Sequence, residues 1–98
     1  GRNGMIFTQN GVMNLRNKKW EDDFTELDPT GTSYVDHQYS RAYVRHLIHA
    51  QEMLGLEILS IHNLAFYLWL VGEARKHILA GDFKAWKEDI TPRLMQRL

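Results

Sequence analysis

The longest uninterrupted run of apolar residues marks the clearest element of the chain. Leu64 to Val71 are eight apolar residues in succession, and a helix of this kind would be apolar on every side. Such a helix is normally central and buried. The pattern predicts a helix that begins at Ser60 or at the His62-Asn63 pair and ends at Ala80, just before Gly81.

A second helical pattern precedes this one. Ser40 is a good N-cap residue, and no helix breaker follows until Gly55, which fits the position just after a helix end. One face of the predicted helix is apolar at a spacing close to 3.6 residues. That stripe consists of Tyr39, Tyr43, Leu47, Ala50 and Leu54.

The two ends of the chain show shorter patterns. A last helix is expected over "DFKAWKEDI", residues 82–90, with Asp82 as N-cap and with Pro92 opening a final turn. Residues 5–16 predict a β-hairpin that turns at Asn10-Gly11, a pair that favours positive φ at both central positions. A long polar connection follows, with room for one helical turn from Trp20 to Phe24 and a turn at residues 28–31.

Together these elements predict an α+β fold that is mainly α, with an N-terminal β-hairpin and a long loop followed by three to four packed helices. The 98 residues fit one domain. We divide it into a hairpin-and-loop part, residues 1–39, and a helical part, residues 40–98. An isolated two-stranded hairpin is marginal in water, so we expect residues 40–90 to be the stable unit and residues 1–30 to be looser.

Composition excludes several kinds of site. Twelve basic and twelve acidic residues cancel, so net charge gives no argument for a nucleic acid or a membrane. The absence of cysteine excludes disulfides, zinc-thiolate sites and thiol nucleophiles, and it suits a cytoplasmic protein. The longest apolar run is far below the roughly 20 residues that span a bilayer. We find no Gly-rich phosphate loop, no close carboxylate pair on one helix face and no serine-histidine arrangement.

One stretch changes this picture. Residues 40–67, "SRAYVRHLIHAQEMLGLEILSIHNLAFY", resemble the C-terminal end of bacterial tRNA-guanine transglycosylases, the queuine tRNA-ribosyltransferases. The opening "GRNGMIFTQNGVMNLRN", residues 1–17, is similar to the same family. The resemblance implies the appended helical subdomain of a TIM-barrel enzyme. That enzyme exchanges guanine at the wobble position of the tRNA anticodon for a 7-deazaguanine precursor of queuosine.

The resemblance also implies where the chemistry lies. Both catalytic aspartates, the nucleophile and the general acid/base, would precede Gly1, so this chain alone would be inactive. The alternative is a stand-alone helical protein-interaction domain without an RNA role.

Two kinds of partner follow from the resemblance. Gly1 and Arg2 would contact the anticodon loop of tRNA, and the parent would be a homodimer. The positions at the dimer interface would be Tyr39, Tyr43, His46 and Leu47, although the same stripe also suits packing on the chain's own core. For the basic cluster Arg16 to Lys19 we favour a solvated surface turn over RNA contact, because the acidic residues 21–23 cancel its field.

In zinc-bearing members of this family the loop reads C-x-C-x-x-C, and a histidine is the fourth ligand. The matching positions here are Gly31, Ser33, Asp36 and His62. No good tetrahedral set remains, so we expect no zinc and no other cofactor in this chain. We expect instead a hydrogen bond between His62 and Asp36, with Ser33 completing the cluster; the alternative is that His62 bonds only to backbone. His46 and His49 alone make weak evidence for a metal.

Overall fold

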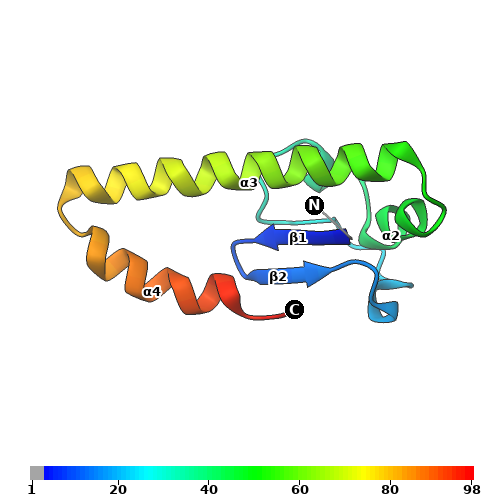
Figure 1. Ribbon diagram of the computed structural model, residues 1–98, viewed down its shortest axis with the longest axis horizontal. Coiled ribbons are helices and arrows are strands. Elements are labelled where there is room, and N and C mark those ends of the chain that lie inside the picture. Colours follow the sequence, from blue (N-terminus) through cyan, green and yellow to red (C-terminus); the bar gives the residue numbers. More distant parts are fainter. Residues whose placement is uncertain (1–3) are drawn as a thin grey trace.

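The chain is mainly helical and carries one short antiparallel hairpin. A computed structural model describes residues 4–98 and shows the elements in this order: β1 (Met5–Thr8), β2 (Gly11–Asn14), the 3-10 helix η2 (Lys18–Trp20), α1 (Val35–Gln38), α2 (Arg41–His49), α3 (Met53–Ala80) and α4 (Phe83–Met95) (Figure 1). The predicted order of a hairpin, a long loop and then helices is confirmed.

The hairpin turns one residue earlier than predicted. Thr8 pairs with Gly11, so the central residues of the turn are Gln9 and Asn10. Gly11 instead begins β2 with a φ of 142°, and a Cβ there would lie 2.3 Å from the carbonyl oxygen of Gln96. Glycine is therefore needed for the close approach of the C-terminal segment rather than for the turn itself.

The C-terminal segment extends the hydrogen bonding of the hairpin. The Val12 N–H donates to the Gln96 carbonyl at 2.8 Å, and the Leu98 N–H donates to the Val12 carbonyl at 2.9 Å. Val12 and Arg97 form an isolated parallel bridge. The C-terminus consequently lies beside β2 (Figure 1).

The helical turn of the polar connection is shifted from its predicted place. It is η2, which ends at Trp20, and the Asn17 side chain caps it by accepting from the Lys19 N–H at 3.0 Å. Trp20 is buried against the core, whereas Phe24, expected in the same turn, is 75% exposed. Burial of the indole accounts for the earlier position.

Helix α2 begins as predicted and ends earlier. The Ser40 hydroxyl accepts a hydrogen bond from the Tyr43 N–H at 3.1 Å, which confirms Ser40 as the N-cap. The helix ends at His49, and Gln51, with a φ of 57°, reverses the chain. The expected end at Gly55 is wrong, because that residue lies inside α3.

Helix α3 begins earlier than predicted, at Met53 rather than at Ser60 or His62. Gly55 stands where α3 crosses α2, and a Cβ there would lie 2.9 Å from the Cβ of Leu47. The glycine therefore serves close helix packing. From the sequence alone, Gly55 is equally consistent with a helix end and with close packing of two helices.

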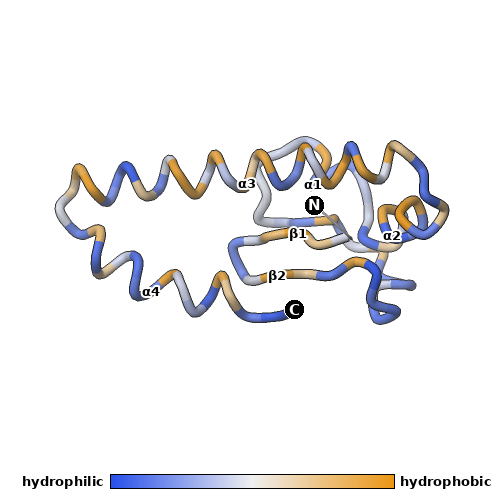
Figure 2. The backbone as a smooth tube through the Cα atoms, in the orientation of Figure 1, coloured by the Kyte–Doolittle hydropathy of each residue, from blue (hydrophilic) through white to orange (hydrophobic). Residues whose placement is uncertain are grey.

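The C-terminal half of α3 is much more exposed than predicted. The helix does end at Ala80, and Gly81 follows with a left-handed φ of 82°, as expected. The burial predicted for Leu64 to Val71 is wrong, since Leu64 is 61% and Leu68 is 60% exposed. The cause is the length of α3, which continues well beyond the end of the hairpin with hydrophobic and hydrophilic positions alternating along it (Figure 2).

Helix α4 returns from the far end of α3 towards the hairpin (Figure 1). Its N-cap is Asp82, as predicted, but it runs through Pro92 to Met95, so the expected final turn at Pro92 is wrong. The bond that proline cannot donate lies on an exposed stretch of helix near its end, where the loss is tolerated. At the α3–α4 turn, His77 bonds to Asp82 at 2.8 Å and stacks on Trp86.

The core is formed by the hairpin, the loop, α2 and the first part of α3. Ile6, Met13 and Leu15 are fully buried. They belong to one cluster with Trp20, Leu27, Val35, Val44, Leu47, Ile48, Ile58 and Leu59. Burial thus places the hairpin residues Ile6, Met13 and Leu15 at the centre, whereas the looser packing expected for residues 1–30 as a whole stays a prediction. The division of the chain at residue 40 stays a prediction.

Within residues 4–98, α3 is the helix that is long and apolar enough to cross a membrane by length and composition. In this fold its first half packs on the hairpin instead. The Asn63 amide donates to the Met5 carbonyl at 3.1 Å and accepts from the Phe7 N–H at 3.2 Å. These bonds satisfy the edge of β1 that faces away from β2.

Candidate functional site

The loop before α1 is shaped by Asp28. One of its carboxylate oxygens accepts from the N–H and the hydroxyl of Thr30, at 3.0 and 2.7 Å. Its carbonyl accepts from the Gly31 N–H at 2.9 Å. These bonds confirm the turn predicted at residues 28–31. The Asp28 residue is only 3% exposed, so its charge lies beneath the loop.

Asp36 joins this loop to α1. Its Oδ2 accepts from the Ser33 N–H at 3.1 Å, while the Ser33 hydroxyl accepts from the Val35 N–H at 3.2 Å. The two bonds run in opposite directions across the start of the helix, as in a capping box. The predicted participation of Ser33 is confirmed.

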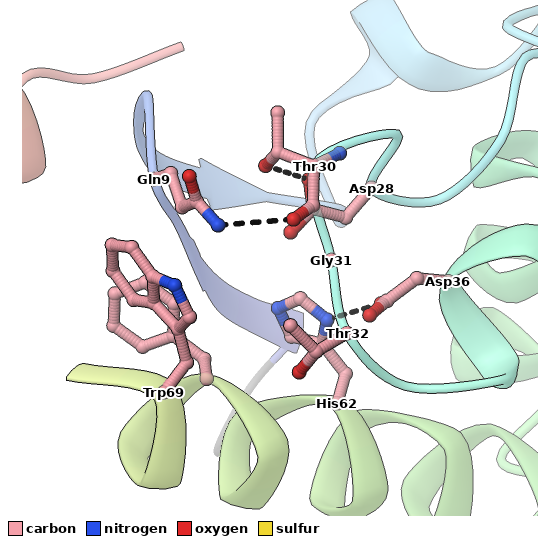
Figure 3. A pocket seen from close by; sticks show the side chains of 9 residues that line it. Gln9, Asp28, Thr30, Gly31, Thr32, Asp36, His62 and Trp69 are labelled. Atoms are coloured by element: carbon pink, nitrogen blue, oxygen red, sulfur yellow. Dashed lines mark hydrogen bonds and ion pairs between the residues drawn. The ribbon is translucent and has the colours of Figure 1, made fainter. Parts of the chain in front are cut away.

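His62 connects the loop to two further elements. It projects from α3, and its Nδ1 bonds to the Oδ1 of Asp36, as predicted (Figure 3). Its Nε2 lies 2.8 Å from the carbonyl oxygen of Phe7 in β1. The alternative that His62 bonds only to backbone is therefore wrong. Both side chains of the His62–Asp36 pair are 1% exposed.

The two hydrogen-bond partners of His62 determine which of its ring nitrogens carry protons. A backbone carbonyl is an acceptor, so Nε2 must donate to it. The Nδ1–Asp36 contact then holds one further proton, shared by an imidazole and a carboxylate. Burial lowers the pKa of His62, but the hydrogen bond and charge of Asp36, the Phe7 carbonyl and the charge of Asp28 outweigh it, so the pKa lies above its ordinary 6.5.

Gly31 makes room for the Asp36 carboxylate. A Cβ at position 31 would lie 1.9 Å from Oδ2 and 2.3 Å from Cγ of Asp36. His37, which follows Asp36 in the sequence, contacts the same loop from outside. Its Nε2 lies 2.9 Å from the Gly31 carbonyl oxygen, and its Nδ1 lies 3.0 Å from the Glu26 carboxylate. Those contacts raise the pKa of His37, the Gly31 carbonyl most strongly.

A small pocket lies next to this cluster. Its volume is about 10 Å³, the room of about one water molecule, and it is partly open to solvent. Gln9 closes one side by donating to the Thr30 carbonyl at 3.0 Å, and Phe66 and Trp69 of α3 also line the pocket. Asp28, Asp36 and His62 place one donor atom each within 4.8 Å of one another. Three buried acid–base groups therefore stand at the mutual distances of metal ligands.

The residues predicted at a dimer interface are divided by the structure. Tyr39 and Tyr43 stack with ring centroids 5.7 Å apart, and Tyr43 is 43% exposed. His46 is also exposed, whereas Leu47 is 7% exposed and belongs to the core. Their role at an interface stays a prediction. Gly1 and Arg2 lie outside the described residues.

The basic cluster at residues 16–19 is partly engaged in contacts within the chain. Residues 16–19 are exposed, but the Lys19 ammonium sits 4.7 Å from the centre of the Trp20 ring, and Asn17 accepts from Arg45 at 3.2 Å. Part of the cluster therefore serves to cover Trp20.

Sequence reasoning missed two members of the site. Asp28 was assigned only to a turn, and Asn63 only to a helix start. The adjacent His62-Asn63 pair held the signal for the second, because two neighbouring polar side chains inside an apolar helix need buried partners. Nothing local to Asp28 distinguishes a turn residue from one whose carboxylate is also buried near His62.

Comparisons with known proteins agree over nearly the whole chain. A family model described as queuine tRNA-ribosyltransferase matches residues 1–96. The queuine tRNA-ribosyltransferase of Aquifex aeolicus is 40% identical over 97 residues, which are 99% of this chain and 26% of that protein. Those of Lactococcus lactis subsp. cremoris (strain SK11) and Caulobacter vibrioides are 44% and 41% identical, with 24% and 25% of their lengths covered. The chain thus spans about a quarter of these relatives.

Proposed function

Since the chain belongs to the queuine tRNA-ribosyltransferase family, we propose that it is the C-terminal part of a tRNA-guanine transglycosylase. The parent exchanges guanine for a 7-deazaguanine precursor of queuosine at the anticodon wobble position of tRNA, in the cytoplasm. The observation that carries this proposal is the match over residues 1–96 together with coverage of only a quarter of each relative. A stand-alone interaction domain fits that coverage poorly.

This segment supports the reaction without performing it. Asp28 and Asp36 are its buried carboxylates, and both are occupied by hydrogen bonds within the loop and to His62. Neither is free to attack a ribose or to move a proton at a substrate. We propose that catalysis belongs to the TIM barrel of the parent, as the family resemblance implies.

The exposed apolar face of α3 supports attachment to the rest of the parent. Ile61, Leu64, Leu68 and Val71 recur at helical spacing and are 36%, 61%, 60% and 41% exposed. Exposed apolar patches of this kind mark interaction surfaces. In the complete protein we assign this face to contact with the barrel.

The activity has a direct test in the complete parent protein. Labelled guanine or 7-deazaguanine is offered with tRNA, and the modified nucleotide is mapped by mass spectrometry of nuclease fragments. We expect incorporation at the wobble guanine. A barrel lacking this chain should lose activity and regain it when the chain is added back. Full activity of the barrel alone, or no exchange by the complete protein, overturns the proposal.

Tyr43 and His46 are the exposed members of the proposed homodimer interface. Truncating a stacked aromatic anchor at an interface commonly weakens association by about 1 kcal/mol or more, roughly fivefold or more in Kd. We expect Tyr43→Ala to raise the dimer Kd of the parent accordingly, measured by analytical ultracentrifugation. Phe24→Ala is the matched control, because Phe24 is a 75% exposed aromatic outside this stripe. Equal effects of the two variants would remove Tyr43 from the interface.

A further inference from the structure

The buried cluster occupies the position where the family resemblance implies a structural zinc ion. Zinc in such sites takes cysteine sulfur and histidine nitrogen in a tetrahedral set. Gly31 has no side-chain ligand atom, and the Ser33 hydroxyl already accepts from the Val35 N–H. His62 uses both ring nitrogens on the acceptors Asp36 and Phe7. The residues present do not fit zinc.

A cation held by oxygen ligands fits no better. Asp28 Oδ1 accepts two hydrogen bonds from Thr30. Asp36 Oδ2 accepts from the Ser33 N–H, and Asp36 Oδ1 is bonded to His62. A metal would need a lone pair of His62, and Nε2 must carry a proton to bond to the Phe7 carbonyl. Metal binding at Asp28, Asp36 and His62 would therefore break bonds that already satisfy these buried groups.

We propose that the hydrogen-bonded chain from Ser33 through Asp36 and His62 to Phe7 replaces a structural zinc ion and holds the loop in place without metal. It connects the same kinds of element that a zinc ion would, namely the loop at Ser33, the start of α1 at Asp36, α3 at His62 and, in addition, β1 at Phe7. The Asp36–His62 bond is the link in this chain that joins the loop to α3.

The substitutions at positions 31 and 36 depend on each other. The Asp36 carboxylate fills the space that a side chain at position 31 would need, with 1.9 Å between Oδ2 and an added Cβ. A cysteine at position 31 is incompatible with this placement of Asp36. Holding the loop without metal therefore requires glycine at position 31 together with aspartate at position 36. This requirement explains why a residue without a side-chain ligand stands at position 31.

The first experiment measures metal content and sensitivity to a chelator. Purified protein expressed in zinc-supplemented medium is analysed by elemental mass spectrometry, and its Tm is measured with and without EDTA. We expect substoichiometric zinc and an unchanged Tm. Stoichiometric zinc, or any other bound divalent metal, or a fall in Tm with EDTA, overturns the proposal. Because the readout is metal and stability, it is independent of transglycosylase activity.

A variant with Gly31→Cys, Ser33→Cys and Asp36→Cys provides the reverse comparison. It restores three thiolates beside His62, and we expect it to bind one zinc ion and to lose several degrees of Tm in EDTA. A variant that folds yet binds no zinc would show that these positions are not a former ligand set, which overturns the idea of replacement.

The dependence between positions 31 and 36 has its own test. Gly31→Ala should lower Tm in the native background and have little effect in an Asp36→Ala background, because the collision partner is gone. Gly72→Ala is the matched control, since nothing lies within 4 Å of an added Cβ there. We expect it to leave Tm unchanged or to raise it. Equal losses for Gly31→Ala in both backgrounds would refute the coupling.

Discussion

At the scale of single residues, Asp36 is the side chain on which most contacts of the site converge. It accepts from Ser33 and bonds to His62, and Gly31 lies against its carboxylate. The sequence predicted the Asp36–His62 pair because both residues stand at positions where the family resemblance implies ligands. It did not predict the Phe7 carbonyl as third member, since a backbone atom leaves no trace in a sequence.

Removing Asp36 is expected to leave a buried imidazole without its acidic partner. Breaking a buried charged pair from one side costs about 3–5 kcal/mol, a large part of the roughly 5–15 kcal/mol that stabilises a small domain. We expect Asp36→Ala to lower the free energy of unfolding in urea by this amount. Asp22→Ala, at an exposed position, should change it by less than about 0.5 kcal/mol. Similar values for the two variants would contradict the role of Asp36.

The pH dependence of stability follows from His62 and His37, whose pKa values are both raised. A histidine with a folded pKa above its unfolded value of about 6.5 stabilises the fold fully below that pH. The stabilisation is lost as pH rises through the folded pKa. Urea unfolding measured at increasing pH from about 6.5 upwards should therefore show a falling free energy of unfolding. His37→Gln should flatten part of the decline, and a rising curve would contradict the assignment.

At the scale of elements, helix ends that depend on local chemistry were predicted and those that depend on packing were not. Ser40 and Gly81 act through their own backbone and neighbours, so their positions could be read from the sequence. The α2–α3 junction is different, because Gln51 adopts a φ of 57° and Gly55 packs against Leu47. Neither the φ of Gln51 nor the packing of Gly55 can be inferred from the residues within one helical turn of them.

The cap at Ser40 gives a quantitative expectation. Its hydroxyl accepts from the Tyr43 N–H, and replacing such a cap by alanine costs about 1 kcal/mol. Thermal or urea unfolding of Ser40→Ala should show this loss. Ser60→Ala is the matched control, because Ser60 is exposed within α3 and alanine is the better helix former. A loss equal to that of Ser40→Ala would argue against capping as the cause.

At the scale of the whole molecule, the distribution of the core was the least predictable feature. The hairpin was expected to be marginal, yet Ile6, Met13 and Leu15 are 0% exposed. The apolar run Leu64 to Val71 was expected to be buried and is largely exposed. Sequence shows how apolar a segment is, but whether a partner covers it depends on where the neighbouring elements end. Here the hairpin is shorter than α3, so the far half of α3 has only α4 beside it (Figure 1).

Amide hydrogen exchange would measure this distribution directly. We expect the amides of β1, β2 and the first half of α3 to exchange most slowly, because they surround the core. Amides beyond residue 70 in α3 should exchange faster. Slowest exchange in residues 70–80 together with fast exchange in the hairpin would restore the original expectation and contradict the packing.

The pairing of the C-terminal segment with β2 also bears on how the chain folds. Gln96 bonds to Asn10 across a sequence separation of 86 residues, and its carbonyl accepts from the Val12 N–H. Contacts between residues so far apart form slowly, since the intervening chain must be ordered first. During synthesis from the N-terminus, the outer edge of β2 has no partner until residues 96–98 are made. That open edge is the place where a nascent chain is most exposed to pairing with another molecule.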